Sequence, residues 1–309
     1  MPAVEIVNIS KSFGEIRALR EINLEINDSE IFGLIGPDGS GKTTLFRILV
    51  SLLLPDEGRA SMCGFDVVRE YREIRKRAGY MAGRFSLYQD LTVEENLEFY
   101  ASVFGTTISK NYDLIKDIYS HIEPFRKRRA GALSGGMKQK LALSCALIHR
   151  PEILILDEPT TGVDAVSRTE FWDMLKKIRA EGITILVSTP YMDEASRCDR
   201  VGLIQKGRLM SVDEPGKLAV KHKTPLYEIR SSGPVYSLLG ILRMQDWCKS
   251  AWLFGQSIHL GSSEALTKKQ IDAILAGIPG IASIKRIPPG VEDTFIELMS
   301  RSELNDEVS

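Results

Sequence analysis

The sequence is poor in the side chains that build metal centres and disulfide frameworks. Only four of its 309 residues are cysteine and four are histidine. The cysteines lie far apart, without the close pairs that zinc sites and small disulfide scaffolds use. They are Cys63, Cys145, Cys198 and Cys248. This spacing favours small buried thiols in a reducing compartment and gives no reason to expect a metal cluster.

Long apolar runs and blocks of like charge are also missing. The longest apolar stretches are too short to cross a bilayer, and no basic-then-apolar leader opens the sequence. The net charge is −1 without a single-sign block, so nothing indicates a nucleic-acid partner. These absences predict a chain that is cytosolic, or peripheral on a membrane through a partner. With 43% hydrophobic residues, it is long enough for two or three cores.

What the sequence does contain is a glycine-rich loop between an apolar run, IFGLIG, and a helix-like segment, LFRILVSLLL. The loop fits the pattern G-x-x-x-x-G-K-[ST]. Its residues are Gly36, Pro37, Asp38, Gly39, Ser40, Gly41, Lys42, Thr43 and Thr44. Glycines let backbone N–H groups curl around a polyphosphate, and the helix that begins near Lys42 points its positive dipole end at the same anion.

Two side chains of this loop suit particular parts of a nucleotide. Lys42 offers a charge for the outer phosphates, and the Thr43 hydroxyl suits Mg²⁺. The alternative is an ordinary glycine-rich turn. It is weak, because the pattern arises by chance in roughly one chain in a thousand of this size. The loop therefore predicts a site for Mg-ATP.

Two adjacent acids end a buried strand, ILIL, further along the chain. Asp157, at the carboxyl end of this strand, can hold the Mg²⁺ shell beside a phosphate loop. Glu158 can orient or deprotonate an attacking water. Two neighbouring carboxylates on a hydrophobic strand would be costly without such partners, so a merely solvated turn is a weak alternative.

Two further features are ambiguous from the local sequence. Ser134, Gly135 and Gly136 open a helix and could form a second anion-binding cup, but a plain N-cap is favoured when they are taken alone. Phe13 stands at the first turn of the chain. It is equally suited to stack on a base or to serve as a core or turn aromatic.

The order of patterns predicts an α/β chain with two domains. Strand and helix patterns alternate over most of it, which indicates a mainly parallel sheet wrapped by helices. Residues from about 85 to 150 are mostly helical, with a capping box at Thr92 and Glu95, and suggest an inserted helical subdomain. A small α+β domain begins after about residue 222, with AWLFGQSIHL as one of its strands. It has no cluster of His, Cys or paired acids, so we expect a structural or regulatory module.

Taken together, the motifs resemble those of an ATP-binding-cassette (ABC) ATPase over about residues 3–220. GPDGSGKTT resembles Walker A, LSGGM the family signature, ILILDE Walker B with its catalytic glutamate, and TTGVD the D-loop. FSLYQDLTVEENLEFYA and PPGVEDTFIELM further resemble ATPase subunits of ABC-2-type drug and polysaccharide exporters. The resemblance implies a P-loop NTPase fold of the ABC type over residues 1–222, with an antiparallel β subdomain. An accessory α+β domain would cover residues 223–309.

In that family two cassettes pair head to tail, with ATP between Walker A of one and the signature of the other. The resemblance therefore implies that Ser134, Gly135 and Gly136 contact the partner's nucleotide. It also implies that Phe13 stacks on adenine and that Asp164 of the D-loop belongs to the nucleotide site. Glu158 would be the catalytic base, while Thr43 and Asp157 would hold Mg²⁺.

The other partner implied by the resemblance is a transmembrane permease of the ABC-2 type. Its coupling helix would enter the helical subdomain around Phe85 to Tyr88. The chain would then lie at the cytoplasmic face of the cell membrane as a peripheral subunit. The exported substrate is not encoded here, because the permease selects it. Nor does the sequence tell whether the cassette is a separate chain or half of a tandem polypeptide.

Two positions depart from the family pattern. The family has a glutamine where this chain has Gly83, and that glutamine reaches Mg²⁺ and the attacking water. It has a histidine where this chain has Pro190, and proline lacks both a side-chain donor and a backbone N–H. Gln89 falls beyond the expected position and is a poor substitute. None of the four histidines of the chain falls at position 190.

These departures suggest a cassette whose own site binds ATP but hydrolyses it slowly or not at all, while its signature completes a partner's site. Two alternatives remain at this stage. One is a purely regulatory cassette without turnover. The other is a soluble ABC ATPase that acts on ribosomes or DNA, although neither a second Walker A motif nor sustained heptads are present.

Overall fold

The computed structural model describes the backbone of residues 2–306 and the side chains of residues 2–300. The chain divides into two compact units, Met1–Pro215 and Gly216–Ser309. The sequence pattern places the same division slightly later, at about residue 222. Within residues 2–306, no helix has both the length and the apolar character needed to cross a membrane.

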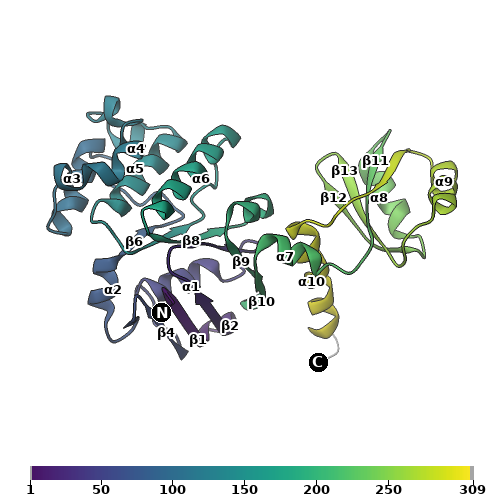
Figure 1. Ribbon diagram of the computed structural model, residues 1–309, viewed down its shortest axis with the longest axis horizontal. Helices are drawn as coiled ribbons and strands as arrows, with labels where there is room; N and C mark the ends of the chain where they lie inside the picture. The colour runs from purple at the N-terminus through teal and green to yellow at the C-terminus, as the bar shows by residue number, and fades with distance from the viewer. Residues whose placement is uncertain (1, 307–309) are drawn as a thin grey trace. The chain divides into compact units, whose positions relative to one another are not determined.

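The first unit contains two sheets (Figure 1). An antiparallel sheet has the strand order β2-β1-β4-β5, and a six-stranded sheet has the order β10-β9-β3-β8-β7-β6. In the larger sheet β9, β3, β8, β7 and β6 are parallel and β10 is antiparallel. The strands are β1 Val4–Phe13, β2 Ile16–Ile26, β3 Ile31–Ile35, β4 Glu57–Met62, β5 Phe65–Asp66, β6 Ala78–Met81, β7 Ile153–Asp157, β8 Thr184–Thr189, β9 Arg200–Gln205 and β10 Arg208–Asp213.

The burial of the strands shows why they form a central layer. Every residue of β3, β7 and β8 is buried, as expected for parallel strands that are covered on both faces. Helix α1 contacts β2, β4 and β7, and its Phe46 and Leu49 belong to the same core as Phe32 of β3. The phosphate loop is thus fixed between a rigid strand and a helix that is packed on both sheets.

The helices of the first unit are α1 Lys42–Leu49, α2 Tyr71–Arg77, α3 Val93–Val103, α4 Tyr112–Tyr119, α5 Gly135–Leu147 and α6 Ala165–Ala180. Helices α3 and α4 both pack on α5 and form the predicted helical subdomain (Figure 1). Thr92 and Glu95 make the predicted capping box at the start of α3. Helix α7, Pro215–Val220, begins where the first unit ends.

The second unit is a βαββαβ domain with an additional helix. Its sheet has the order β12-β13-β11-β14, with all neighbours antiparallel, which is the ferredoxin-like arrangement. Its elements are β11 Leu226–Ser231, α8 Val235–Arg243, β12 Cys248–Phe254, β13 Ser257–Ser262, α9 Lys268–Gly277, β14 Ile281–Arg286 and α10 Val291–Asp306. The predicted α+β class is confirmed.

One strand of the second unit differs from the sequence-based expectation. AWLFGQSIHL is not a single strand, because the chain turns at Gly255 and forms the hairpin β12–β13. Gly255 has φ 57°, in the left-handed region that a turn requires and that glycine adopts without steric cost. The alternating apolar pattern continues across the turn, which is why the two strands look like one.

Asn96 of α3 is predicted to stabilise the segment that precedes this helix. Its side chain is fully buried, accepts from Tyr88 N at 3.0 Å, and donates to Tyr88 O and Thr92 O at 3.0 and 2.9 Å. Asn96→Leu leaves these backbone groups unpaired and should lower the free energy of unfolding by about 2 kcal/mol in urea titrations. Glu98→Ala, at an exposed position of the same helix, should stay within about 0.5 kcal/mol of wild type. Equal effects of the two substitutions would contradict this assignment.

Candidate nucleotide-binding and hydrolysis site

The glycines of the phosphate loop are required by close backbone approaches. A Cβ at Gly36 would lie 2.1 Å from the carbonyl oxygen of Ile204. At Gly41, which has φ +108°, it would lie 2.5 Å from the carbonyl oxygen of Ala18. The loop therefore packs directly on neighbouring backbone, and its N–H groups stay unobstructed at the N-terminus of α1.

Lys42 is held over this loop by three oxygen atoms. Its side chain is only 3% exposed, and its Nζ donates to Gly36 O at 2.9 Å and to Pro37 O at 3.0 Å. The same Nζ lies 3.1 Å from Oε1 of Glu158. A buried ammonium requires such partners. Lys42 and the proposed catalytic base are thus in direct contact.

Thr43 and Asp157 form the pair that suits a magnesium ion. The Thr43 hydroxyl donates to Asp157 Oδ1 at 3.0 Å, and the Asp157 side chain is buried. Hydroxyl and carboxylate oxygens are the hard ligands that Mg²⁺ prefers. The donor set therefore fits the ion that accompanies ATP, which would shield the phosphates and orient the terminal one.

Ser188 of β8 is a site residue that the sequence-based reasoning missed. Its hydroxyl donates to Asp157 Oδ1 at 2.7 Å and accepts from the backbone N–H of Glu158 at 2.9 Å. Glu158 has φ 49°, an uncommon conformation for a residue other than glycine. Ser188 therefore fixes both acids at once. The sequence places Ser188 at the end of a second buried strand, but the pairing of this strand with β7 is visible only in the structure.

A cavity of about 430 Å³ lies in front of the phosphate loop. It is lined by Gly39 and residues 41–44 of the loop, by Glu158, and by Ile16 to Ala18 at the start of β2. Phe13 is not among the lining residues; it is 50% exposed, and Lys11 Nζ lies 5.7 Å from its ring centroid. Stacking of adenine on Phe13 remains a prediction.

Comparison with known proteins assigns this arrangement to a family. Residues 19–161 match the family described as "ABC transporter". The chain is 32% identical over 303 residues to "Nod factor export ATP-binding protein I" of Rhizobium sp. (strain N33), a match that covers 97% of each chain. It belongs to the ABC transporter family.

A second relative is much longer than the segment that it shares with this chain. The "Probable multidrug ABC transporter ATP-binding protein YbhF" of Escherichia coli (strain K12) is 40% identical over 256 residues. The match covers 80% of this chain and 42% of that protein, so the chain spans about two-fifths of the relative's length.

Solved cassettes share the fold. "Dimeric Structure of MJ0796, a Bacterial ABC Transporter Cassette" has 27% identity and a TM-score of 0.62, covering 68% of this chain and 98% of that one. The structure of cbiO1 from Clostridium perfringens has 25% identity and a TM-score of 0.64, covering 71% and 91%. The predicted P-loop fold of the ABC type is thereby confirmed.

The signature residues of this cassette do not meet its own phosphate loop. Ser134 caps α5, where its hydroxyl accepts from Met137 N at 3.4 Å. Ser134, Gly135 and Gly136 are absent from the lining of the 430 Å³ cavity. Their capping role is therefore visible in this chain, whereas contact with a partner's nucleotide stays an expectation.

Asp164 of the D-loop caps α6. Its Oδ1 accepts from Ser167 N at 3.0 Å and from Val166 N at 3.1 Å. The hydrogen bonds from Ser167 hold the pKa of this carboxyl below its usual value. A cap of this kind fixes where α6 begins and so shapes the D-loop. Asp164 does not line the 430 Å³ cavity in front of the phosphate loop, nor the 170 Å³ cavity beside Gly83 that is described below.

Gly83 lies directly against Asp157, the acid expected to hold Mg²⁺. A Cβ at this position would be 3.0 Å from the carbonyl oxygen of Asp157 and 3.7 Å from its Oδ2. The position is thus next to this candidate metal ligand, but it has no side chain to contribute. Gln89 does not replace it. It lies beside Gly131, whose N–H donates to its backbone oxygen at 2.9 Å.

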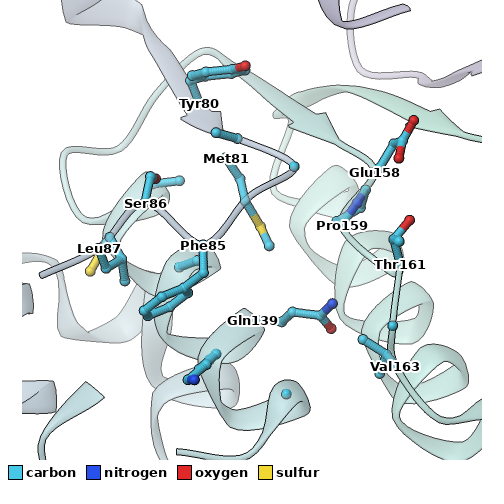
Figure 2. A pocket seen from close by; sticks show the side chains of 18 of the residues that line it. Tyr80, Met81, Phe85, Ser86, Leu87, Gln139, Glu158, Pro159, Thr161 and Val163 are labelled. Atoms are coloured by element: carbon cyan, nitrogen blue, oxygen red, sulfur yellow. The ribbon is translucent and has the colours of Figure 1, made fainter. Parts of the chain in front are cut away.

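A second cavity, of about 170 Å³, opens beside Gly83 (Figure 2). Its wall includes Phe85 and Glu158, and Gln139 extends into it from α5 toward the segment that carries Thr161 and Val163 (Figure 2). Gln139 was not singled out in the sequence, since it follows the signature without a motif of its own. The cavity links the Gly83 segment, the signature helix and the D-loop segment.

Ser188→Ala is predicted to weaken the metal site without unfolding the cassette. The substitution removes the donor to Asp157 and the side-chain acceptor for Glu158 N, which keeps its bond to the backbone oxygen of Ser188 at 3.1 Å. Loss of such an outer partner typically costs about 10-fold or more in metal affinity. Mn²⁺ titration by electron paramagnetic resonance in the presence of ATP would measure it. Ser196→Ala, which removes an exposed hydroxyl bonded to Asp193 O, is the control and should leave the affinity unchanged.

Proposed function

We propose, first, that this chain is the ATP-binding, energy-coupling subunit of an ABC-type membrane exporter. We propose, second, that the nucleotide site on its own phosphate loop binds Mg-ATP but hydrolyses it slowly. Family membership and the names of its relatives support the first part, because one is a Nod factor export protein and another a probable multidrug transporter protein. The second part depends on one observation. Gly83 lies against Asp157, where the family has a glutamine, and has no side chain to contribute.

The binding half of the site is complete. Lys42, the loop N–H groups, Thr43 and Asp157 together supply charge, donors and metal ligands for a triphosphate. When ATP binds, its phosphates compete with Glu158 for the Lys42 ammonium. Glu158 is then released to accept a proton from the attacking water.

The hydrolytic half lacks two contacts to the terminal phosphate and the water. Gly83 has no side chain, and Pro190, directly after β8, has neither a side-chain donor nor a backbone N–H. Removal of one transition-state donor typically costs about 10²–10³ in rate. Losses within one site are not additive. The loss in rate from both missing contacts together is therefore expected to be at least that from one of them.

The proposed assembly is an asymmetric pair of cassettes beneath a permease. Ser134, Gly135 and Gly136 would contact ATP held by a second cassette that retains the glutamine and the histidine. The transmembrane partner would be a permease of the ABC-2 type, which binds near Phe85 to Tyr88 and places the chain peripherally at the cytoplasmic face of the membrane. The match to 42% of the YbhF relative is compatible with a second cassette on the same polypeptide.

The first test is turnover by the isolated chain. Mg-ATP should bind with ordinary affinity, measured by calorimetry, while steady-state hydrolysis should be at least about 10²-fold below that of a cassette with both contacts. Glu158→Gln should lower this residual turnover further, because Glu158 is its proposed base, and should leave ATP binding in place. Brisk hydrolysis that Glu158→Gln abolishes would overturn the slow-site proposal. Single-turnover hydrolysis measures whether the site turns over at all, and its absence would favour a purely regulatory cassette.

The second test restores the missing side chains. Gly83→Gln combined with Pro190→His should raise turnover by about 10²-fold or more. Gly83→Gln alone should do less, because the contact from position 190 is still missing. In both variants the new Cβ meets the Asp157 carbonyl oxygen at 3.0 Å, and the segment must shift by a few tenths of an ångström. Gln89→Ala is the matched control and should have no effect. A double variant that binds ATP but stays as slow as the parent would show that other residues limit the rate.

A further inference from the structure

The second unit contains a cavity of about 190 Å³ that the nucleotide site does not use. One face of its sheet, which presents Tyr227 and Ile258, is covered by the hydrophobic core that includes α8 and α9. On the opposite face, Trp252, His259 and Glu228 are cross-strand neighbours. The cavity lies between this opposite face and α10, and residues of both line it.

Two histidine–carboxylate pairs connect α10 to the rest of the domain beside this cavity. His259 Nδ1 lies 2.7 Å from Asp293 Oδ1, and the ring of His259 is stacked on Phe254 at 3.8 Å. His222 Nδ1 lies 2.8 Å from Glu297 Oε2. The walls of the cavity are therefore fixed by histidine–carboxylate contacts between separate elements, as in a preformed site.

The acids that line the cavity have their acceptor atoms occupied. Besides His259, Asp293 accepts from Gly290 N at 2.7 Å. Glu297 accepts from the Thr224 hydroxyl at 3.1 Å and faces His222. Neither carboxylate is left as an unsatisfied charge that would attract a cation. A ligand of this cavity therefore has to supply hydrogen-bond partners for the polar groups other than these two acids.

The polar groups that remain are Lys249 and His222. Lys249 Nζ donates to Thr224 Oγ1 at 3.2 Å and forms no ion pair with a described side chain, so two of its three N–H bonds are available. His222 has a side chain only 4% exposed, and its Nε2 is buried without a hydrogen-bond partner. Lys249, which is exposed, is therefore the cationic donor that a ligand of this cavity can reach.

The rest of the wall is apolar. Leu226 and Ile296 line the cavity, and Trp252, which is 39% exposed, contributes an aromatic surface at the same place. We propose that this cavity binds a small organic carboxylate, which accepts hydrogen bonds from Lys249 and lays its apolar body against Trp252 and Ile296. The accessory unit would thereby be a sensor of small metabolites that is separate from the ATP site.

Benzoate is the probe that tests this proposal, with benzamide as its neutral counterpart. Saturation-transfer NMR and tryptophan fluorescence on the full chain, at matched ionic strength, should give a Kd for benzoate below about 1 mM and no measurable binding of benzamide. Hexanoate, which is aliphatic, should also bind. Lys249→Met should weaken benzoate binding by about 10-fold or more, as expected for loss of a charged hydrogen bond.

Two further variants separate the cavity from other surfaces. Ser300→Leu adds bulk to the cavity wall in α10 and should abolish binding, while leucine is a good helix former and keeps the helix intact. Lys269→Met removes an exposed lysine on α9 and should change nothing. ATP affinity should be the same in all variants. Failure of benzoate and hexanoate to bind below about 10 mM, or unchanged binding in both Lys249→Met and Ser300→Leu, would overturn the proposal.

Discussion

The ion pair between Lys42 and Glu158 is the contact on which the nucleotide site depends. Lys42 is buried, and an isolated ammonium in such a place would be very costly. Two loop carbonyls and one carboxylate oxygen compensate for its lost hydration. Glu158 is therefore the counter-ion of Lys42 in this structure. Under the proposed function, a phosphate oxygen of ATP would replace Glu158 at Lys42, and this exchange would couple binding to the preparation of hydrolysis.

Binding and hydrolysis rely on different elements of this cassette. The binding groups come from the β3–α1 loop and the end of β7, which lie in the most deeply buried part of the sheet. The hydrolytic contacts that the proposed function treats as missing would belong to the segment after β6 and the residue after β8, at the edge of the same site. Under that proposal, Gly83 and Pro190 would leave out catalytic donors without disturbing the core. Such a separation would allow hydrolysis to be impaired while ATP binding is retained.

The sequence sufficed for those features that depend on local pattern. The phosphate loop, the two acids after ILIL, the capping box of Thr92 and Glu95, and the α+β second domain all follow from residue types at fixed spacing. Ser188 could not be found this way, because its role arises from the pairing of β7 with β8 in the sheet. The same is true of Gln139, which enters the cavity beside Gly83 through the packing of α5. The sequence predicts one strand for AWLFGQSIHL because apolar and polar residues alternate on both sides of Gly255. The turn at Gly255 leaves this alternation unchanged, so it is visible only in the structure.

The second domain gives a physical reason for the stretch PPGVEDTFIELM. Asp293 in this stretch accepts from Gly290 N and from His259, so it closes the turn before α10 and binds the helix to the sheet at the same time. Thr294 Oγ1 donates to Leu218 O and joins the helix to α7. A ferredoxin-like sheet has one face open after its two helices have packed on the other. In this chain the stretch covers that open face only partly, and Lys249 remains exposed beside the cavity, where a ligand can reach it. The stretch PPGVEDTFIELM, which resembles a family motif, therefore also forms one wall of the cavity.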